Sequence, residues 1–188
     1  MVLPIYAYGQ PVLKEEGAEI DVTAYPELNA LIENMWETMR TAKGVGLAAQ
    51  QVGLGIKLFV IDTTPYKDED HPDFIGIRKV FINAHILEES GEEWAFEEGC
   101  LSIPDLRAEV DRPPKIEIEY ENELGEKFKE TYEGLNARVI QHEYDHTMGV
   151  LFVDHLKPLK KRMIQRKLEA IRKGQVEAEY RLRFYRSK

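Results

Sequence analysis

The segment Gln141-His142-Glu143-Tyr144-Asp145-His146 constrains this chain most, because its two histidines can act together only on one backbone conformation. Residues four apart on an α-helix are rotated by about 40° and lie about 6 Å apart along the axis. His142 and His146 would then direct both imidazoles at one metal ion, with Glu143 beside it as a general base. The alternative is an amphipathic helix with two surface histidines. We favour the metal site, since the spacing, the glutamate and the helical pattern agree.

Hydrophobic periodicity predicts the elements around this segment. Helices are expected over 26–41 and over 135–148, the second ending at Gly149. Alternating apolar and charged residues predict a hairpin over 115–122 and 127–133, although Glu130 falls on the apolar face of its second strand. We also expect strands over 57–63 and 79–87, a surface loop over 64–76, mixed short strands over 92–111, and a basic helix over 159–173. The glycine-rich stretch 44–53 allows no assignment.

Together these elements predict an α+β fold. Mainly antiparallel sheets would pack around a central metal-binding helix, with an amphipathic helix near the N-terminus and a basic helix near the C-terminus. A chain of 188 residues favours one domain, or one domain with an extension. We therefore divide it into a domain over 1–154 that holds the motifs and a basic helical extension of the same domain over 155–188.

Charge is distributed unevenly between these two parts. Residues 1–154 carry 13 basic and 31 acidic side chains, whereas residues 155–188 carry 12 basic and 3 acidic ones. The net charge of −9 argues against a nucleic-acid partner, but the +9 of the last segment does not. A lone cysteine, no visible signal peptide and no apolar run of about 18 residues predict a cytoplasmic protein without a membrane partner.

Two histidines leave a catalytic metal site incomplete, because such a site usually has three protein ligands and one open position. The metzincin pattern would place a third histidine at position 152, which is Phe152 here. Glu169, the choice of a thermolysin-like enzyme, lies among basic residues where an ion pair is the simpler explanation. Cys100 and His155 both stay open on spacing alone. Cys100 could also be a small buried residue of the core.

Three separated motifs resemble the peptide deformylase family of bacterial type. They are Gly44-Val45-Gly46-Leu47-Ala48-Ala49-Gln50-Gln51, Glu98-Gly99-Cys100-Leu101-Ser102, and Gln141-His142-Glu143-Tyr144-Asp145-His146. The resemblance implies a hydrolase of protein biosynthesis that processes the N-terminal methionine, removing the formyl group of new formyl-methionyl polypeptides and releasing formate. An H-E-x-x-H metallopeptidase, which would use a downstream third ligand, is the alternative.

The resemblance also implies roles for individual residues. Cys100, His142 and His146 would hold one divalent ion, expected to be Fe(II), although sulfur and nitrogen ligands also suit zinc, nickel or cobalt. A metal-bound water would attack the formyl carbon with Glu143 as general base. The side-chain amide of Gln51 and the backbone N–H of Leu101 would bind the oxyanion. Gln50 occupies a variable position of the motif.

Substrate contacts are predicted partly from the motifs and partly from helix geometry. Gly46 would offer its backbone to the substrate, where a side chain would block close approach. Val139 and Leu135 lie one and two turns before His142, on roughly the same helix face. The candidate pocket walls are Val45, Leu101, Val139 and Leu135, while Arg107 either borders the peptide path or pairs with a nearby acid such as Asp105.

The basic C-terminal helix suggests a second partner. Its apolar residues Leu159, Met163, Ile164, Leu168 and Ile171 form a stripe surrounded by Lys and Arg. This helix either docks on the acidic body or contacts the ribosome, as C-terminal helices of bacterial deformylases do. Oligomeric state and the role of loop 64–76 do not follow from the sequence.

Overall fold

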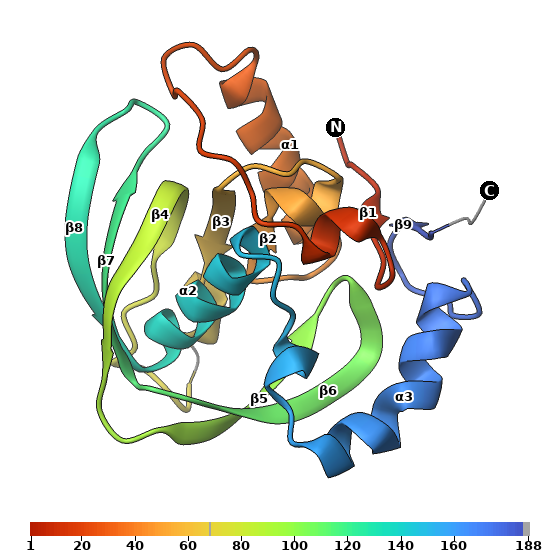
Figure 1. The fold of residues 1–188 in the computed structure, drawn as a ribbon. Coiled ribbons are helices and arrows are strands. Elements are labelled where there is room, and N and C mark those ends of the chain that lie inside the picture. Colours follow the sequence, from red (N-terminus) through yellow and green to blue (C-terminus); the bar gives the residue numbers. More distant parts are fainter. Residues whose placement is uncertain (68, 186–188) are drawn as a thin grey trace.

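A five-stranded antiparallel sheet and a separate two-stranded hairpin enclose the helix that bears both histidines (Figure 1). The computed structural model describes residues 1–67 and 69–185. Residue 68 of the predicted loop and residues 186–188 of the predicted extension lie outside the described residues. The observed arrangement confirms the predicted α+β class with mainly antiparallel pairing.

The elements follow the predicted order with small shifts at their ends. The α-helices are α1 (Leu28–Thr41), α2 (Gly134–Thr147) and α3 (Pro158–Arg172). The strands are β1 (Ile5–Tyr6), β2 (Gly46–Ala48), β3 (Leu58–Asp62), β4 (Arg78–Ser90), β5 (Trp94–Cys100), β6 (Ile103–Arg112), β7 (Lys115–Glu121), β8 (Lys127–Glu133) and β9 (Leu182–Arg183). Short 3₁₀ turns cover Pro11–Lys14, Ala49–Val52, Thr64–Tyr66 and Phe152–His155.

The main sheet has the strand order β2-β3-β4-β7-β8 and carries a helix on each face. Because successive side chains of a strand point to opposite faces, β3 contributes to two cores. Leu58 and Val60 pack with the buried face of α1, whereas Phe59 and Ile61 pack with α2. This arrangement makes α2 an interior helix, covered by the sheet on one side.

The β5–β6 hairpin covers another side of α2, and α3 packs behind it (Figure 1). Ile164, Leu168 and Ile171 of α3 are buried against apolar residues of β6 such as Leu106. β9 then pairs in parallel with β1, which joins the end of the described chain to its beginning. No helix of the described residues combines the length and apolar character that a bilayer crossing requires.

Candidate active site and metal centre

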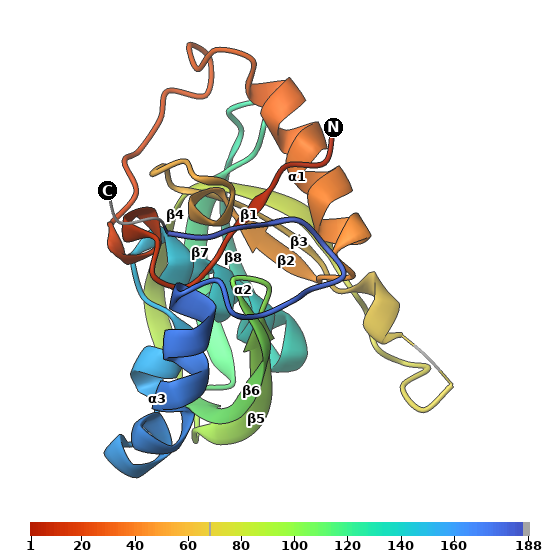
Figure 2. The same ribbon diagram turned by 90° about the vertical axis from the view of Figure 1, so that its right-hand side faces the viewer.

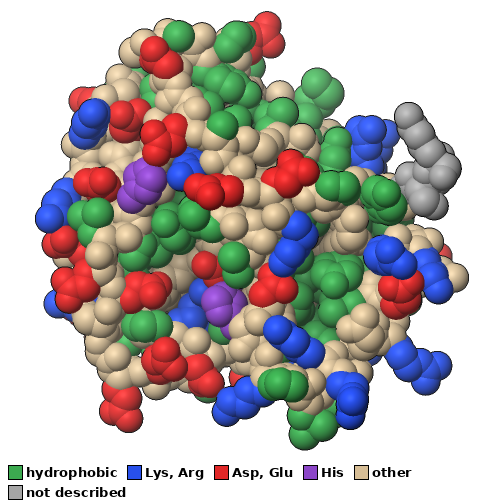
Figure 3. Space-filling model, in the orientation of Figure 1, with side chains coloured by type: hydrophobic (Ala, Val, Ile, Leu, Met, Phe, Trp, Pro, Cys, Tyr) green, Lys and Arg blue, Asp and Glu red, His purple; other side chains and the backbone are tan. Residues whose placement is uncertain are grey.

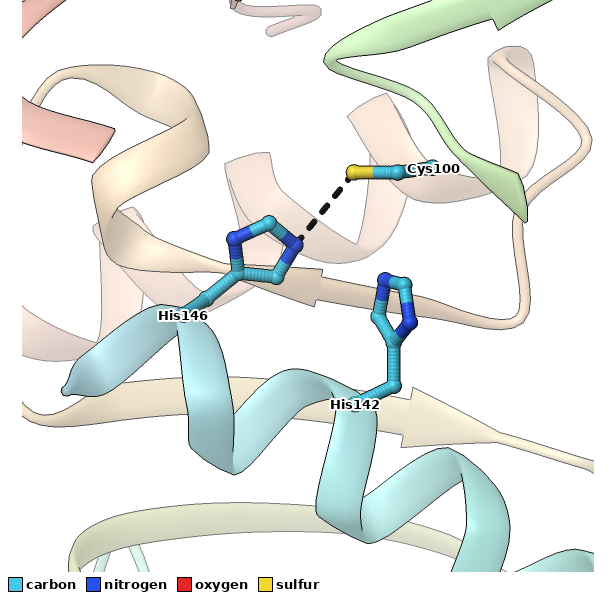
Figure 4. A group of neighbouring side chains, drawn as sticks. All are labelled: Cys100, His142 and His146. Atoms are coloured by element: carbon cyan, nitrogen blue, oxygen red, sulfur yellow. Dashed lines mark hydrogen bonds between the residues drawn. The ribbon is translucent and has the colours of Figure 1, made fainter. Parts of the chain in front are cut away.

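Three donor side chains meet where α2 passes the end of β5. His142 and His146 project from the same side of α2 toward Cys100 (Figure 4). The three ligand atoms lie within 4.8 Å of one another, and Cys100 Sγ is 3.3 Å from His146 Nε2. A register irregularity between Gly99 and Cys100 interrupts the β5–β6 pairing just where the cysteine turns toward the helix. One sulfur and two imidazole nitrogens at this separation fit a transition-metal ion.

Glu98 orients one of these histidines. It is buried, and its Oε1 lies 2.7 Å from His142 Nδ1, which leaves His142 Nε2 available to an ion. Burial alone would raise the pKa of Glu98, but His142 and Arg112 outweigh it and hold that pKa well below its usual range. Arg112 donates to both carboxylate oxygens at 2.8 and 3.1 Å, and Arg138 donates to Oε2 at 3.0 Å.

The other candidate third ligands are engaged elsewhere. His155 Nε2 lies 2.7 Å from Asp145 Oδ2, and Asp145 in turn accepts from Arg112. Glu169 pairs with Arg172 on α3 at 2.9 Å. Cys100 is therefore the donor that the fold brings to the two histidines.

Glu143 lines a cavity beside these candidate ligands. One of its carboxylate oxygens has no hydrogen-bond partner among the described residues. Burial raises its pKa to about 7 despite the opposing effect of His142 and His146. Gly46 allows this carboxylate to lie close to the backbone of β2, because a Cβ at Gly46 would lie 2.6 Å from Glu143 Cδ. A carboxyl group in this setting can exchange a proton near neutral pH.

The two adjacent glutamines have different surroundings. Gln51 Oε1 accepts from the Ala48 N–H at 2.9 Å, which directs Gln51 Nε2 toward Cys100 Sγ at 3.4 Å and Ser102 Oγ at 3.3 Å. Gln50 is fully buried, and neither atom of its amide has a partner among the described residues. Gln51 is therefore the glutamine that presents an N–H donor beside the candidate ligands.

A cavity of about 360 Å³ opens beside these groups. Its walls include Val45, Gly46, Leu101, Arg107 and Val139, all predicted as substrate contacts or oxyanion donors. Arg107 fulfils both predicted alternatives, since it borders the cavity and also donates to an acid at 3.1 Å. That acid is Glu97 and not Asp105. Leu135 does not line the cavity, because the cavity faces the middle of α2 and Leu135 lies a further turn away, at its beginning.

Sequence comparison decides the family. The model of the polypeptide deformylase family matches residues 2–162. This chain belongs to the polypeptide deformylase family. Peptide deformylases of Christiangramia forsetii and Flavobacterium johnsoniae are 56% and 54% identical to it over 194 residues, covering 100% of this chain and 98% of each relative.

Solved deformylase structures show the same fold. A peptide deformylase from Legionella pneumophila is 38% identical with a TM-score of 0.79, covering 93% of this chain and 98% of that one. A plant peptide deformylase is 34% identical with a TM-score of 0.81, covering 95% and 96%. The predicted activity is thereby confirmed: the chain is a hydrolase that removes the N-terminal formyl group from nascent peptides. The metallopeptidase alternative is not favoured.

Several residues around the deformylase site had no role assigned from the sequence. Arg138 precedes His142 by four residues, and this spacing places both residues on the same face of a helix. The sequence therefore indicates that Arg138 lies near the site. It is buried, stacks on Trp94 at 4.6 Å and pairs with Glu98. Arg112 and Tyr180 reach the site from distant segments, and their local patterns carry no such signal.

Proposed function

We propose that Cys100, His142 and His146 hold the catalytic ion and that Glu143 moves the protons of deformylation. The observation that supports the assignment is that Cys100, His142 and Glu143 line one cavity, while a ring nitrogen of His146 lies within 4.8 Å of the other two candidate ligand atoms. One cysteine sulfur and two imidazole nitrogens within 4.8 Å of one another, with Glu98 in contact with His142, suit a transition metal. When bound, the ion would supply Lewis-acid chemistry, which favours ionisation of water and polarises a carbonyl group.

In this proposal Glu143 accepts a proton from the water that attacks the formyl carbon. It then gives a proton to the amine nitrogen as the carbon–nitrogen bond breaks, which yields formate and a free N-terminus. A pKa of about 7 suits both steps, because a group titrating near the working pH can accept and donate.

Negative charge develops on the formyl oxygen during the attack. The Nε2 amide of Gln51 and the backbone N–H of Leu101 are the donors that we assign to it. The Ala48 N–H fixes the Gln51 amide before substrate arrives, so little reorganisation is needed.

The methionine side chain would occupy the apolar part of the cavity, against Val45, Leu101 and Val139. Gly46 would offer its backbone to the peptide, and Arg107 would border the peptide path at the exposed side. Because this substrate is a newly made polypeptide, we place the enzyme in the cytoplasm.

The test of this assignment is formate release from formyl-methionyl peptides by the Fe(II)-loaded enzyme. We expect Glu143→Ala to lose at least about 10²-fold in kcat, because a positioned general base contributes that much. The metal content should stay at one ion per chain. Glu177→Ala, which removes an exposed acid outside the cavity, is the control. Wild-type kcat in Glu143→Ala would refute the assigned role.

We further propose Fe(II) as the physiological ion, with zinc, nickel or cobalt able to substitute. Anaerobic purification followed by metal analysis should find iron. Reconstitution of the metal-free protein with Fe(II) should give a higher kcat/KM than reconstitution with zinc, and equal values would contradict this choice.

A second proposed partner is the ribosome, through the basic face of α3. Lys160, Lys161, Arg166 and Lys167 are exposed, and none of them forms an ion pair with another residue in the described part of the chain. Unpaired cations along one helix suit the phosphates of RNA.

A further inference from the structure

The chain returns to the active site after α3. Residues 175–183, which we call the C-terminal strap, lie beyond the residues 2–162 that the family model matches. Backbone hydrogen bonds anchor the strap to β1, from the Ile5 N–H to the Arg181 carbonyl at 2.9 Å and from the Ala7 N–H to the Arg183 carbonyl at 3.0 Å. In Figure 2 the strap loops around the turn of the β5–β6 hairpin. That turn bears Leu101.

Tyr180 makes the contact between the strap and this turn. Its hydroxyl donates to the Leu101 carbonyl at 2.8 Å, and its half-buried ring lines the catalytic cavity. Burial raises the pKa of Tyr180, so the hydroxyl stays protonated and remains a donor near neutral pH. The neighbouring Glu179 forms an exposed ion pair at 2.6 Å with Lys43, which also lines the cavity.

Leu101 is held by groups on both sides. The preceding residue is the candidate ligand Cys100, and the carbonyl of the following residue, Ser102, accepts from the Tyr8 N–H at 2.8 Å. The Leu101 side chain packs so closely on Gly44 that a Cβ there would lie 2.8 Å from Leu101 Cδ1. The N–H and the carbonyl of Leu101 lie in different peptide planes, separated by two soft dihedrals. Because Cys100 and Ser102 are also held, a restraint on the Leu101 carbonyl leaves the Leu101 N–H less freedom to turn.

We propose that Tyr180 is a positioning residue for deformylation, which holds the Leu101 carbonyl so that the Leu101 N–H stays directed at the formyl oxygen. The inference rests on the proposed role of Leu101 as an oxyanion donor. A donor that is fixed before the reaction stabilises the transition state more than one that must reorganise. The loss of this contact should therefore appear in kcat more than in KM.

The test compares Tyr180→Phe with Tyr185→Phe in the full-length, metal-loaded enzyme. Tyr180→Phe keeps the ring and removes only the hydroxyl. We expect its kcat for a formyl-methionyl peptide to fall about three- to tenfold, the effect of one neutral hydrogen bond, with KM and metal content unchanged. Tyr185→Phe alters an exposed tyrosine two residues after the strap and should match wild type.

A second readout separates positioning from general stability. In ¹⁵N-leucine-labelled, zinc-loaded protein, the Leu101 amide signal should shift and exchange faster in Tyr180→Phe, while the melting temperature stays within a few degrees. Wild-type kcat, a rise in KM alone, or an unchanged Leu101 signal would each overturn the proposal. Failure of the proposed role of Leu101 is distinguishable, because it would appear as wild-type kcat together with a shifted Leu101 amide signal, whereas failure of the positioning role would leave that signal unchanged.

Discussion

Gln50 and Gln51 show how two identical neighbours acquire different surroundings. Gln51 is held by the Ala48 N–H and reaches the sulfur of Cys100. Gln50 is buried near Gly17, and its amide has no hydrogen-bond partner among the residues that the structure describes. The family motif singles out the second glutamine. The structure adds the reason, since only that amide lies beside the candidate ligands.

The first prediction concerns these two side chains. Gln51→Ala should lower kcat by about 10²- to 10³-fold, the usual effect of removing one oxyanion donor. Gln50→Ala should retain kcat, because its amide lies outside the cavity. Formate release at saturating peptide measures both variants. Comparable losses would refute the assignment of Gln51.

At the same scale, the third ligand shows where local reasoning ends. His142 and His146 are one helical turn apart, so their spacing alone predicts that the two imidazoles lie close together. Cys100 lies on a different element, and spacing alone did not exclude His155 as the third ligand. The fold favours Cys100, since it brings Cys100 near the histidines while Asp145 engages His155.

Among the elements, α3 departs most clearly from its predicted pattern. Five apolar residues were predicted to form one stripe. The structure buries Ile164, Leu168 and Ile171, but leaves Leu159 and Met163 73% and 70% exposed. Figures 1 and 2 give the reason, since the start of α3 extends beyond the β5–β6 hairpin. Periodicity predicts which residues share a face, but not how far the covering element reaches.

The second prediction follows from this division of α3. Leu168→Ala should lower the free energy of unfolding by about 2–4 kcal/mol, because it leaves a cavity in the core shared with β6. Leu159→Ala makes the same chemical change at an exposed site and should alter it by less than about 0.5 kcal/mol. Urea unfolding of the metal-loaded proteins measures both. Equal effects would contradict the observed packing.

For the whole molecule, the division of charge along the sequence becomes a division in space. Lys and Arg side chains gather over α3 in Figure 3, while many acidic side chains cover the side formed by β4, β7 and β8. The apolar side of α3 shares a core with Leu106 of β6. This shared core supports the prediction that residues 155–188 extend the domain of residues 1–154, which stays a prediction.

The third prediction tests the proposed ribosome contact. Reversing Lys161 and Arg166 to Glu should weaken co-sedimentation with ribosomes, and wild-type binding should fall as salt rises. Formate release from short peptides should not change, because neither residue lines the cavity. Reversing Arg40 and Lys67, which are exposed away from α3, changes the net charge equally and should preserve binding. Equal binding by both variants, or binding insensitive to salt, would reject the contact.

The sequence alone determined the α+β class, most helices and strands, the histidine pair with its glutamate, and the family. These follow from periodicities of two and 3.6 residues and from motifs a few residues long, so they are local properties. Only the tertiary structure decided that Glu98 orients His142, that Leu135 lies outside the cavity and that Tyr180 reaches Leu101. These relations join residues far apart in the sequence. They depend on how separate elements pack, which no local spacing specifies.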